Sequence, residues 1–342
     1  MSVEPLIEEA GLARTGAPLD AMNSPTGEKR KVETRHRSPT QIALARLRKD
    51  KVAMTCLGIF IFFVLIAIFA PLLAKLEGQD PSTLHQDLLD EYGYPTFVVS
   101  SEHWFGIEPR LGRDLFARFV YGARPSLIVA CTVTVITGIV GVVMGLVAGF
   151  LGGWVDRVIS WVIDFVLSLP YLLFAIAVPA VLLTMFVEDA STAGVTEVTR
   201  ARFASLIIVL SFFGWASLAR LIRGEVLSLR EREFIAAAKV LGVPTRKVLF
   251  KELLPNLVAP IIISTSLALP TYIVAEAGLT FLGVGLVEPT PSWGLTIANA
   301  TTYYRADPLY LWLPVLAISI LVLSLSLLGD SIRDAFDPRT RR

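Results

Sequence analysis

Six long apolar runs alternate with polar segments along the chain. They cover residues 53–74, 126–150, 161–187, 203–222, 257–280 and 309–329. Because a helix needs about 20 mostly apolar residues to cross the hydrocarbon core of a bilayer, each run is long enough to span a membrane. The pattern therefore predicts an all-α integral membrane protein with about six transmembrane helices.

Two of the runs carry polar or helix-breaking residues. The fourth run ends at Arg220 and Arg223, which makes it the weakest of the six. The fifth contains Pro270 and Glu276. Since proline removes a backbone hydrogen bond from a helix, we expect a break or kink in the second half of this span.

The composition supports the membrane assignment. Of the 342 residues, 54% are hydrophobic and 18% are charged, whereas soluble domains average about 25% charged residues. The net charge of +1 gives no reason to expect nucleic acid as a partner. The three histidines, at positions 36, 85 and 103, lack the spacing of metal ligands, so we expect no metal site.

The polar segments divide the chain into three parts. Residues 1–42 form a basic, aperiodic tail, for which we predict disorder in the cytosol. Residues 43–125 hold the first span and a long loop, and residues 126–342 hold a core of five spans. In the loop, residues 111–120 mix apolar and charged positions, which is typical of a short surface helix.

Basic residues set the predicted orientation. With the N-terminus in the cytosol, 23 of the 31 Lys and Arg residues fall in cytosolic segments and 8 in the opposite segments. Short loops rich in Lys and Arg stay on the cytosolic side of a membrane, so we expect both termini there. The basic end of the tail is either this topology signal alone or also a contact for anionic membrane lipid.

Small residues recur on one face of the second run. Gly141, Gly145, Gly149 and Gly153 are four apart, and glycines at this spacing let membrane helices approach closely. We predict a helix–helix contact at this face; a pore lining is the alternative.

The segment of residues 228–256, between the fourth and fifth runs, is charged and rich in alanine. Ser228 and Glu231 have the spacing of a capping box, which predicts a short helix beginning there. Gly242 stands where a left-handed helix cap is expected. We predict a second helix from about residue 245 to residue 254, ended by Pro255.

The first of these two predicted helices has an apolar face built largely of small side chains. Its members are Phe234, Ala237, Ala238 and Leu241. Such a face suits helix-in-groove docking on another protein, with charged residues around the contact. The alternative is an amphipathic loop packed on its own membrane domain.

The same segment resembles the cytoplasmic signature of ABC importer permeases, which is written EAA-x3-G-x9-I-x-L-P. The matching residues are Ala236, Ala237 and Ala238, then Gly242 after three residues, then Leu254 and Pro255 at the end. Ala236 replaces the glutamate of the signature, as is common in the peptide-importer branch of the family. Glu252 replaces its isoleucine, and a charge in this apolar slot would alter the contact with a partner.

The resemblance extends to three further stretches, similar to dipeptide, oligopeptide and nickel permeases. They read "RLGRDLFARFVYGARPSL", "EAGLTFLGVGLVEPTPSWG" and "LLGDSIRDAFDPRTR". The resemblance covers the chain from about residue 43 to its end, and it is to the second of the two permease subunits in such systems. It implies a type I ABC importer permease of the bacterial cytoplasmic membrane that carries di- and oligopeptides.

Three kinds of partner follow from this resemblance: a sister permease, two cytosolic ATP-binding subunits and an extracytoplasmic solute-binding protein. Membrane lipid is a fourth expected partner, from the apolar spans and the basic tail. The resemblance also implies that the segment between spans 4 and 5 is a coupling helix that receives the ATPase stroke. The candidate coupling residues are Arg232, Glu233, Phe234, Ala236, Ala237, Ala238, Leu241, Gly242, Leu254 and Pro255.

Sequence signatures of catalysis are missing from the chain. It has no G-x-x-x-x-G-K-[ST] phosphate loop, no G-x-S-x-G elbow and no H-E-x-x-H pair. We therefore expect a non-catalytic subunit that binds no cofactor, with ATP and Mg on the partner ATPases. The alternatives are a self-contained secondary transporter or channel, or the same scaffold carrying nickel or another small solute.

Two ionisable residues, Asp164 and Glu276, lie within predicted spans, where such groups are candidates for function. They either line a translocation path and bind a solute amine, or satisfy donors of the backbone or of a partner subunit. The segment "PTPSWG", which contains Trp293, also has two interpretations. The segment either contacts the binding protein, or it is an aromatic anchor at the membrane surface.

Overall fold

The computed structural model describes residues 39–97, 99–187 and 193–337, which form helices and loops without a β-strand. The predicted tail therefore lies outside the described residues, except that residues 39–42 form the first turn of a helix. The helical elements are α1 (Pro39–Leu47), α2 (Lys51–Glu77), the 3-10 turn η1 (Gln86–Leu88), α3 (Leu115–Leu151), α4 (Gly153–Ser168), α5 (Tyr171–Phe186), α6 (Val195–Arg230), α7 (Glu233–Val240), α8 (Thr245–Lys247), the π turn η2 (Val248–Leu253), α9 (Leu254–Phe281), α10 (Trp293–Ala300) and α11 (Pro308–Phe336).

Five helices within the described residues are long and apolar enough to cross a membrane. They are α2, α3, α6, the continuous helix of residues 245–281 and α11. The predicted third span, residues 161–187, is not one helix, because α4 and α5 are bent by 92° relative to each other. Leu169, the first of the two residues between them, is extended. The ring of Pro170 disfavours the helical conformation in the residue before it.

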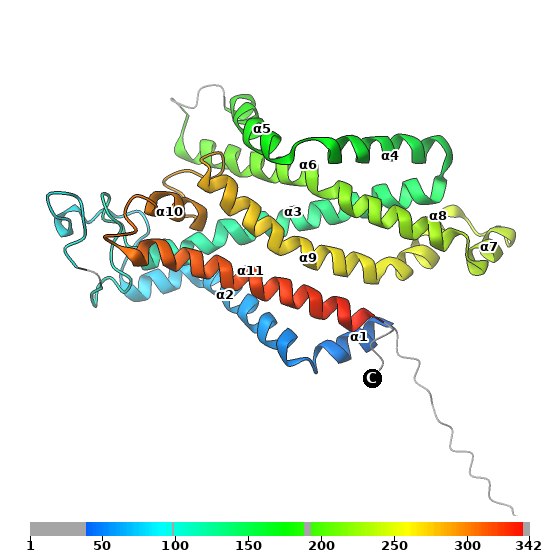
Figure 1. Ribbon diagram of the computed structural model, residues 1–342, viewed down its shortest axis with the longest axis horizontal. Helices are drawn as coiled ribbons and strands as arrows, with labels where there is room; N and C mark the ends of the chain where they lie inside the picture. The colour runs from blue at the N-terminus through cyan, green and yellow to red at the C-terminus, as the bar shows by residue number, and fades with distance from the viewer. Residues whose placement is uncertain (1–38, 98, 188–192, 338–342) are drawn as a thin grey trace, which may run out of the picture. The chain divides into compact units, whose positions relative to one another are not determined.

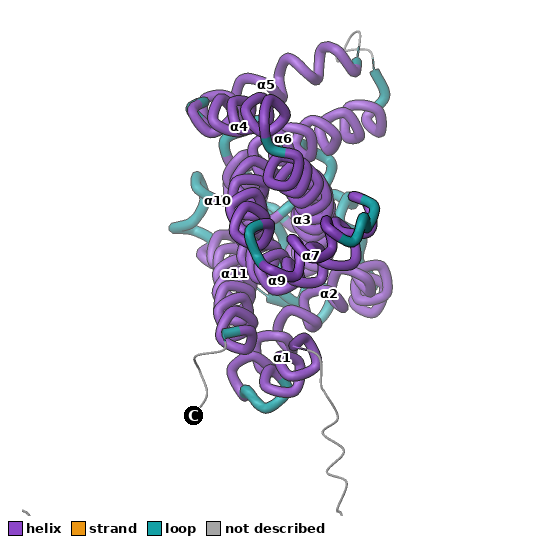
Figure 2. The backbone as a smooth tube through the Cα atoms, turned by 90° about the vertical axis from the view of Figure 1, so that its right-hand side faces the viewer, coloured by secondary structure: helices purple, strands orange, loops and turns teal. Residues whose placement is uncertain are grey.

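The long helices form one bundle with two distinct ends (Figure 1). α7 and α8 lie at one end, which we call the segment end, and α10 lies with the loop of residues 79–114 at the other, the loop end (Figure 1). Figure 2 shows α4 and α5 at one edge of the bundle and α1 at the opposite edge. α1 is tied to the end of α11, since the Arg46 guanidinium donates to the backbone carbonyl of Ala335 at 3.2 Å.

The predicted surface helix of residues 111–120 is wrong. These residues instead lead into α3, which begins at Leu115 and continues through Pro125 to Leu151. The helix starts at this point because the Asp114 carboxylate caps it, accepting from the backbone N–H of Ala117 at 2.6 Å. Arg118 and Val120 are buried, so this part of the helix packs inside the protein.

The predicted helix–helix contact at the glycine face is confirmed for three of its four residues. A Cβ atom built on Gly145 would lie 2.7 Å from the Ala219 carbonyl oxygen and 2.7 Å from the Ile222 Cβ of α6. Gly141 and Gly149 are equally crowded by α6. Gly153 is not part of this contact, because α3 ends before it and nothing lies within 4 Å of its Cβ position.

A proline inside α2 is matched by an arginine on α3. Pro71 has no backbone N–H, so the carbonyl of Ala67, four residues earlier, loses its helical partner. The Arg124 guanidinium of α3 donates to this carbonyl oxygen at 2.7 Å. The exchange replaces a lost bond within α2 by a bond between α2 and α3.

The aromatic-anchor interpretation of Trp293 is wrong. Its side chain is fully buried at the start of α10, so it does not sit at the membrane surface. The ring stacks on Phe119 and meets the edge of Phe63, both at 5.7 Å between centroids. Its indole N–H donates to the Phe119 carbonyl at 3.0 Å. Trp293 therefore holds α10 against α2 and α3.

Candidate functional site

The 228–256 segment begins later than its sequence predicts. α6 continues to Arg230, so Ser228 lies inside this helix and does not cap a new one. α7 begins at Glu233, after a tight turn in which the N–H of Arg232 donates to the Leu229 carbonyl at 3.0 Å. α6 is prolonged because Val226 in its last turns is fully buried, and this packing outweighs the capping signal.

The glycine cap at the end of α7 is confirmed. Gly242 has φ +70, the left-handed conformation that glycine adopts without a steric cost. The N–H of Val243 donates to the Ala238 carbonyl at 3.0 Å. This bond, which reaches back five residues, is the mark of a Schellman motif. The cap fixes the direction in which the chain leaves α7.

One side of α7 packs on the bundle. Ile235 is fully buried in a cluster with Val248, Leu253 and residues of α3 and α6, including Ile222. Ala238 is half-buried against the same cluster. The sequence analysis did not single out Ile235, although its place between Phe234 and Ala236 shows that apolar residues occupy more than one face of the helix.

The other side of α7 is open. Phe234 is 42% exposed, Val240 86% and Leu241 80%. Ala236 and Ala237 are also exposed, as are the bordering Arg232 and Glu233. Both interpretations of the segment therefore describe part of it. One face anchors α7 to its own bundle, and no described residue covers the apolar face of Phe234, Ala237 and Leu241.

The second predicted helix of the segment does not end at Pro255. α8 passes through the π turn η2 into α9, and residues 245–281 form one helix. In the π turn, the Leu254 N–H bonds to the Leu249 carbonyl, five residues back. Pro255 then lies in the first turn of α9, where a missing N–H is tolerated. Leu254 is half-buried and Pro255 exposed, so the end of the signature sits at the base of the fifth span.

The two ionisable residues of the predicted spans have different surroundings. Glu276 is fully buried. Its carboxylate accepts from three hydroxyls, those of Ser126 at 2.6 Å, Thr280 at 3.0 Å and Ser292 at 3.4 Å. Asp164 is 68% exposed and pairs with Arg220 of α6. Both carboxylates therefore satisfy donors within the chain itself.

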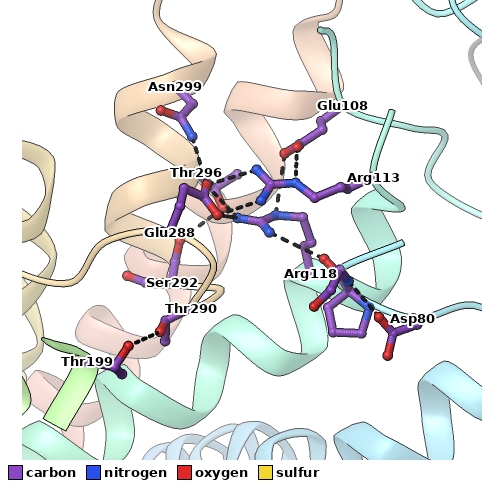
Figure 3. A network of polar contacts seen from close by, with 12 residues as sticks. Asp80, Glu108, Arg113, Arg118, Thr199, Glu288, Thr290, Ser292, Thr296 and Asn299 are labelled. Atoms are coloured by element: carbon purple, nitrogen blue, oxygen red, sulfur yellow. Dashed lines mark hydrogen bonds and ion pairs between the residues drawn. The ribbon is translucent and has the colours of Figure 1, made fainter. Parts of the chain in front are cut away.

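A charged network at the loop end was missed by the sequence analysis (Figure 3). The Arg113 guanidinium forms two bonds to Glu288, at 2.5 and 2.8 Å, and contacts Glu108. Arg118 donates to Glu288 at 3.0 Å, and Asn299 of α10 donates to it at 3.3 Å. A signal was present, because the arginines and Glu288 lie in two of the stretches that resemble permeases.

Charge pairing sets the protonation of this network. Burial by itself would lower the pKa of the Arg113 guanidinium, but its bonds to Glu288 and Glu108 raise that pKa above the usual value. Burial would raise the pKa of the Glu288 carboxyl, but the hydrogen bond from Arg113 and the charge of Arg118 lower it below the usual value. The Arg113 guanidinium and the Glu288 carboxylate therefore both stay charged at neutral pH.

The described residues contain no group of three or more His, Cys, Asp or Glu side chains that could hold a metal ion. The geometry of the site is that of an interaction surface: an anchored helix with an open apolar face at one end of a membrane bundle.

Comparison with known families gives two matches that together run along most of the chain. Residues 141–342 match the family described as "Binding-protein-dependent transport system inner membrane component". Residues 38–90 match the "N-terminal TM domain of oligopeptide transport permease C".

Individual relatives agree with these matches. The chain is 33% identical to the oligopeptide transport system permease protein OppC of Bacillus subtilis, over 92% of this chain and 95% of the relative. It is 37% identical to the dipeptide transport system permease protein DppC of Alkalihalophilus pseudofirmus, over 89% and 91%. It is 34% identical to the glutathione transport system permease protein GsiD of Shigella dysenteriae, over 89% and 92%. The match to a solved structure of the MetNI methionine ABC transporter spans 62% of this chain and 94% of that chain, at 18% identity and a TM-score of 0.45.

Proposed function

The chain belongs to the binding-protein-dependent transport system inner membrane component family, and we propose that it is the membrane-spanning permease subunit of an ATP-driven importer for di- and oligopeptides. In this proposal it forms half of the translocation path together with a sister permease. Two cytosolic ATPase subunits bind ATP and Mg, and an extracytoplasmic binding protein delivers the solute. This chain itself is not catalytic.

The open apolar face of α7 is the observation that carries the coupling part of the proposal. Phe234 and Leu241 are large apolar side chains exposed at the segment end, whereas Ile235 anchors the same helix to the bundle. A helix that is fixed on one side and apolar on the other can dock in a groove and pass on the motion of the groove. The orientation with both termini in the cytosol places this face toward the ATPases.

The cargo is argued from the relatives. Their names give oligopeptides, dipeptides and glutathione as what they transport, and all three are peptides or peptide-like solutes. The same scaffold carrying nickel or another small solute is the second candidate.

We test the coupling role with Leu241→Asp, because Leu241 is 80% exposed and its replacement leaves the packing of the bundle intact. Burying a carboxylate in an apolar groove costs several kcal/mol, so we expect ATP-driven peptide uptake by the reconstituted complex to fall by about 10-fold or more. Less of the ATPase should also co-purify with the variant.

The matched control is Thr245→Asp. It adds the same charge to an exposed position of the same segment, at the start of α8 and outside α7. We expect it to keep uptake close to that of the unchanged protein. Normal uptake by Leu241→Asp, with normal insertion in the membrane, would refute docking through the face of α7.

A further inference from the structure

Two cavities lie next to each other along the bundle, and both are partly open to its surface. The first has a volume of about 650 Å³ and is lined by α5, α6, α9 and α11, including Tyr171 and Ser326. The second, of about 330 Å³, is lined by α3, α6 and α9, including Ser217 and Thr265. Along both α6 and α9, the lining of the first cavity lies toward the loop end and that of the second toward the segment end. The cavities therefore succeed each other along the bundle.

Three residues line both cavities: Gly214, Thr271 and Tyr272. Tyr272 is the largest of them, and its side chain is only 8% exposed. Its hydroxyl donates to Thr137 Oγ1 of α3 at 3.2 Å, while its backbone belongs to α9. The Tyr272 side chain thus reaches from α9 to α3 where the two cavities meet.

The position of the ring depends on a glycine. A Cβ atom on Gly214 would lie 2.2 Å from the Tyr272 hydroxyl oxygen and 2.7 Å from Thr137 Cγ2, far inside van der Waals contact. Any side chain at residue 214 would therefore push Tyr272 out of this position. The hydrogen bond to Thr137 and the space left by the missing side chain of Gly214 together fix one position for the Tyr272 ring, which we call its seated position.

The cavity linings also indicate a class of solute. No charged side chain lines either cavity within the described part of the chain. Six hydroxyl-bearing residues line the smaller cavity. Thr265 donates to a carbonyl of its own helix at 2.8 Å, which leaves its oxygen lone pairs free to accept. Such a lining suits an internally neutral solute with N–H and O–H donors, and it disfavours an uncompensated charge.

We propose that Tyr272 is a gate between two compartments of the solute path, seated by Thr137 and Gly214, and that the smaller compartment accepts the N–H and O–H donors of a net-uncharged solute. This rests on the proposed function, because only a permease has a solute path. In the seated position the ring separates the compartments. Transport requires it to leave Thr137, and the shared wall of the two cavities then opens.

The test is thiol accessibility in the assembled complex. Cys56 and Cys131 are replaced by Ser to remove the native thiols. Thr265→Cys reports on the smaller cavity, because Thr265 lines that cavity and not the first. A membrane-impermeant methanethiosulfonate is added from the side of the loop end. Tyr272→Ala should raise the labelling rate at Thr265→Cys by about 10-fold or more, since the rate follows the accessible population. Tyr272→Phe, which keeps the ring but loses the bond to Thr137, should give an intermediate rate.

Two further reporters control the result. Ser326→Cys lines only the first cavity and should be labelled equally fast with and without the tyrosine. Ser205→Cys is buried in α6 outside both cavities, and it should remain unlabelled in every variant. If Ser205→Cys became accessible in Tyr272→Ala, general loosening of the bundle would explain the labelling and the gate would be refuted.

An unchanged rate at Thr265→Cys in Tyr272→Ala would also overturn the gate, because it would mean that lipid or the sister permease fills the first cavity. ATP-driven uptake by the Thr265→Cys protein, measured in the same preparation, separates the two proposals. Uptake without any effect of Tyr272→Ala on labelling would leave the importer function intact and remove only the gate.

Discussion

An arginine side chain replaces a backbone hydrogen bond that a proline removes. Pro71 leaves the Ala67 carbonyl of α2 without a helical partner, and Arg124 of α3 donates to it at 2.7 Å. In a membrane no water is available to take this place. Arg124 therefore supplies the hydrogen bond that α2 lacks and also links α2 to α3.

This arrangement makes a double substitution informative. Arg124→Met should lower the free energy of unfolding in detergent by about 1–3 kcal/mol, because it removes a bond from a charged donor to a buried carbonyl. Pro71→Ala restores an N–H four residues after Ala67 and should recover part of the loss. The measurement is a thermodynamic cycle of the four proteins by denaturant titration. Strict additivity of the two substitutions would contradict the exchange of partners.

At the scale of elements, the contact between α3 and α6 determines how the bundle packs. Gly141, Gly145 and Gly149 let the two helices approach until a single added carbon would collide with backbone atoms of α6. The same helix pair carries Thr137 and Gly214, which seat Tyr272. The glycine face therefore sets the spacing on which the proposed gate depends.

We expect Gly145→Ala to destabilise the protein by about 1–3 kcal/mol, since its Cβ would lie 2.7 Å from both backbone and side-chain atoms of α6. Gly138→Ala on the same helix is the control, because the nearest atom to its Cβ position is Thr265 Cγ2 at 3.5 Å. Thermal unfolding of the two variants in detergent makes the comparison. Equal midpoints would show that the close approach is not needed.

Much of this element-level structure could be predicted from the sequence, and two of the failures share a cause. Five of the apolar runs coincide with span-length helices, and Gly242 has the predicted left-handed cap. The two errors concern prolines. A proline is a local signal, but whether it breaks a helix depends on what surrounds it: Pro170 produces a bend of 92°, whereas Pro255 follows a π turn and is absorbed.

For the candidate site, the sequence identified the right segment but only one of its faces. The exposed positions of Phe234 and Leu241 follow from spacing, while the anchoring role of Ile235 depends on residues of α3 and α6 that are far away in the sequence. The two cavities could not be predicted at all, because their linings combine five helices that are far apart in the sequence.

At the scale of the whole molecule, the charged network joins the elements of the loop end. Arg113 and Glu108 belong to the loop, Arg118 to α3 and Glu288 to the connection between α9 and α10. The Tyr310 hydroxyl of α11 donates to Glu108 at 3.3 Å. The long loop is thereby fixed to α3, to α11 and to the connection between α9 and α10.

The network should give the loop end a defined response to acid. The pKa of Glu288 is lowered in the folded protein, so its stabilising effect is fully present above the ordinary carboxyl pKa of about 4.3 and is lost as the pH falls through the folded value. We expect hydrogen exchange of residues 79–114 to show constant protection from pH 7 to pH 5, after correction for intrinsic rates, and to lose it only in stronger acid.

Glu288→Gln is the matching variant for this prediction. It removes the negative charge that faces both arginines, so protection of the loop should already be reduced at pH 7. Loss of protection in the unchanged protein between pH 7 and pH 5 would point to another group as the source of the response.

The uninterrupted helix of residues 245–281 has a mechanical consequence. From Thr245 to Tyr272 this rod is about 40 Å long at 1.5 Å per residue, so each degree of tilt about one end displaces the other by about 0.7 Å. A rotation of only a few degrees imposed beside α7 would therefore carry the tyrosine ring beyond the reach of its hydrogen bond to Thr137. If this helix tilts as one body, it acts as a lever arm, and its length converts a small angle beside α7 into a step of atomic size at Tyr272.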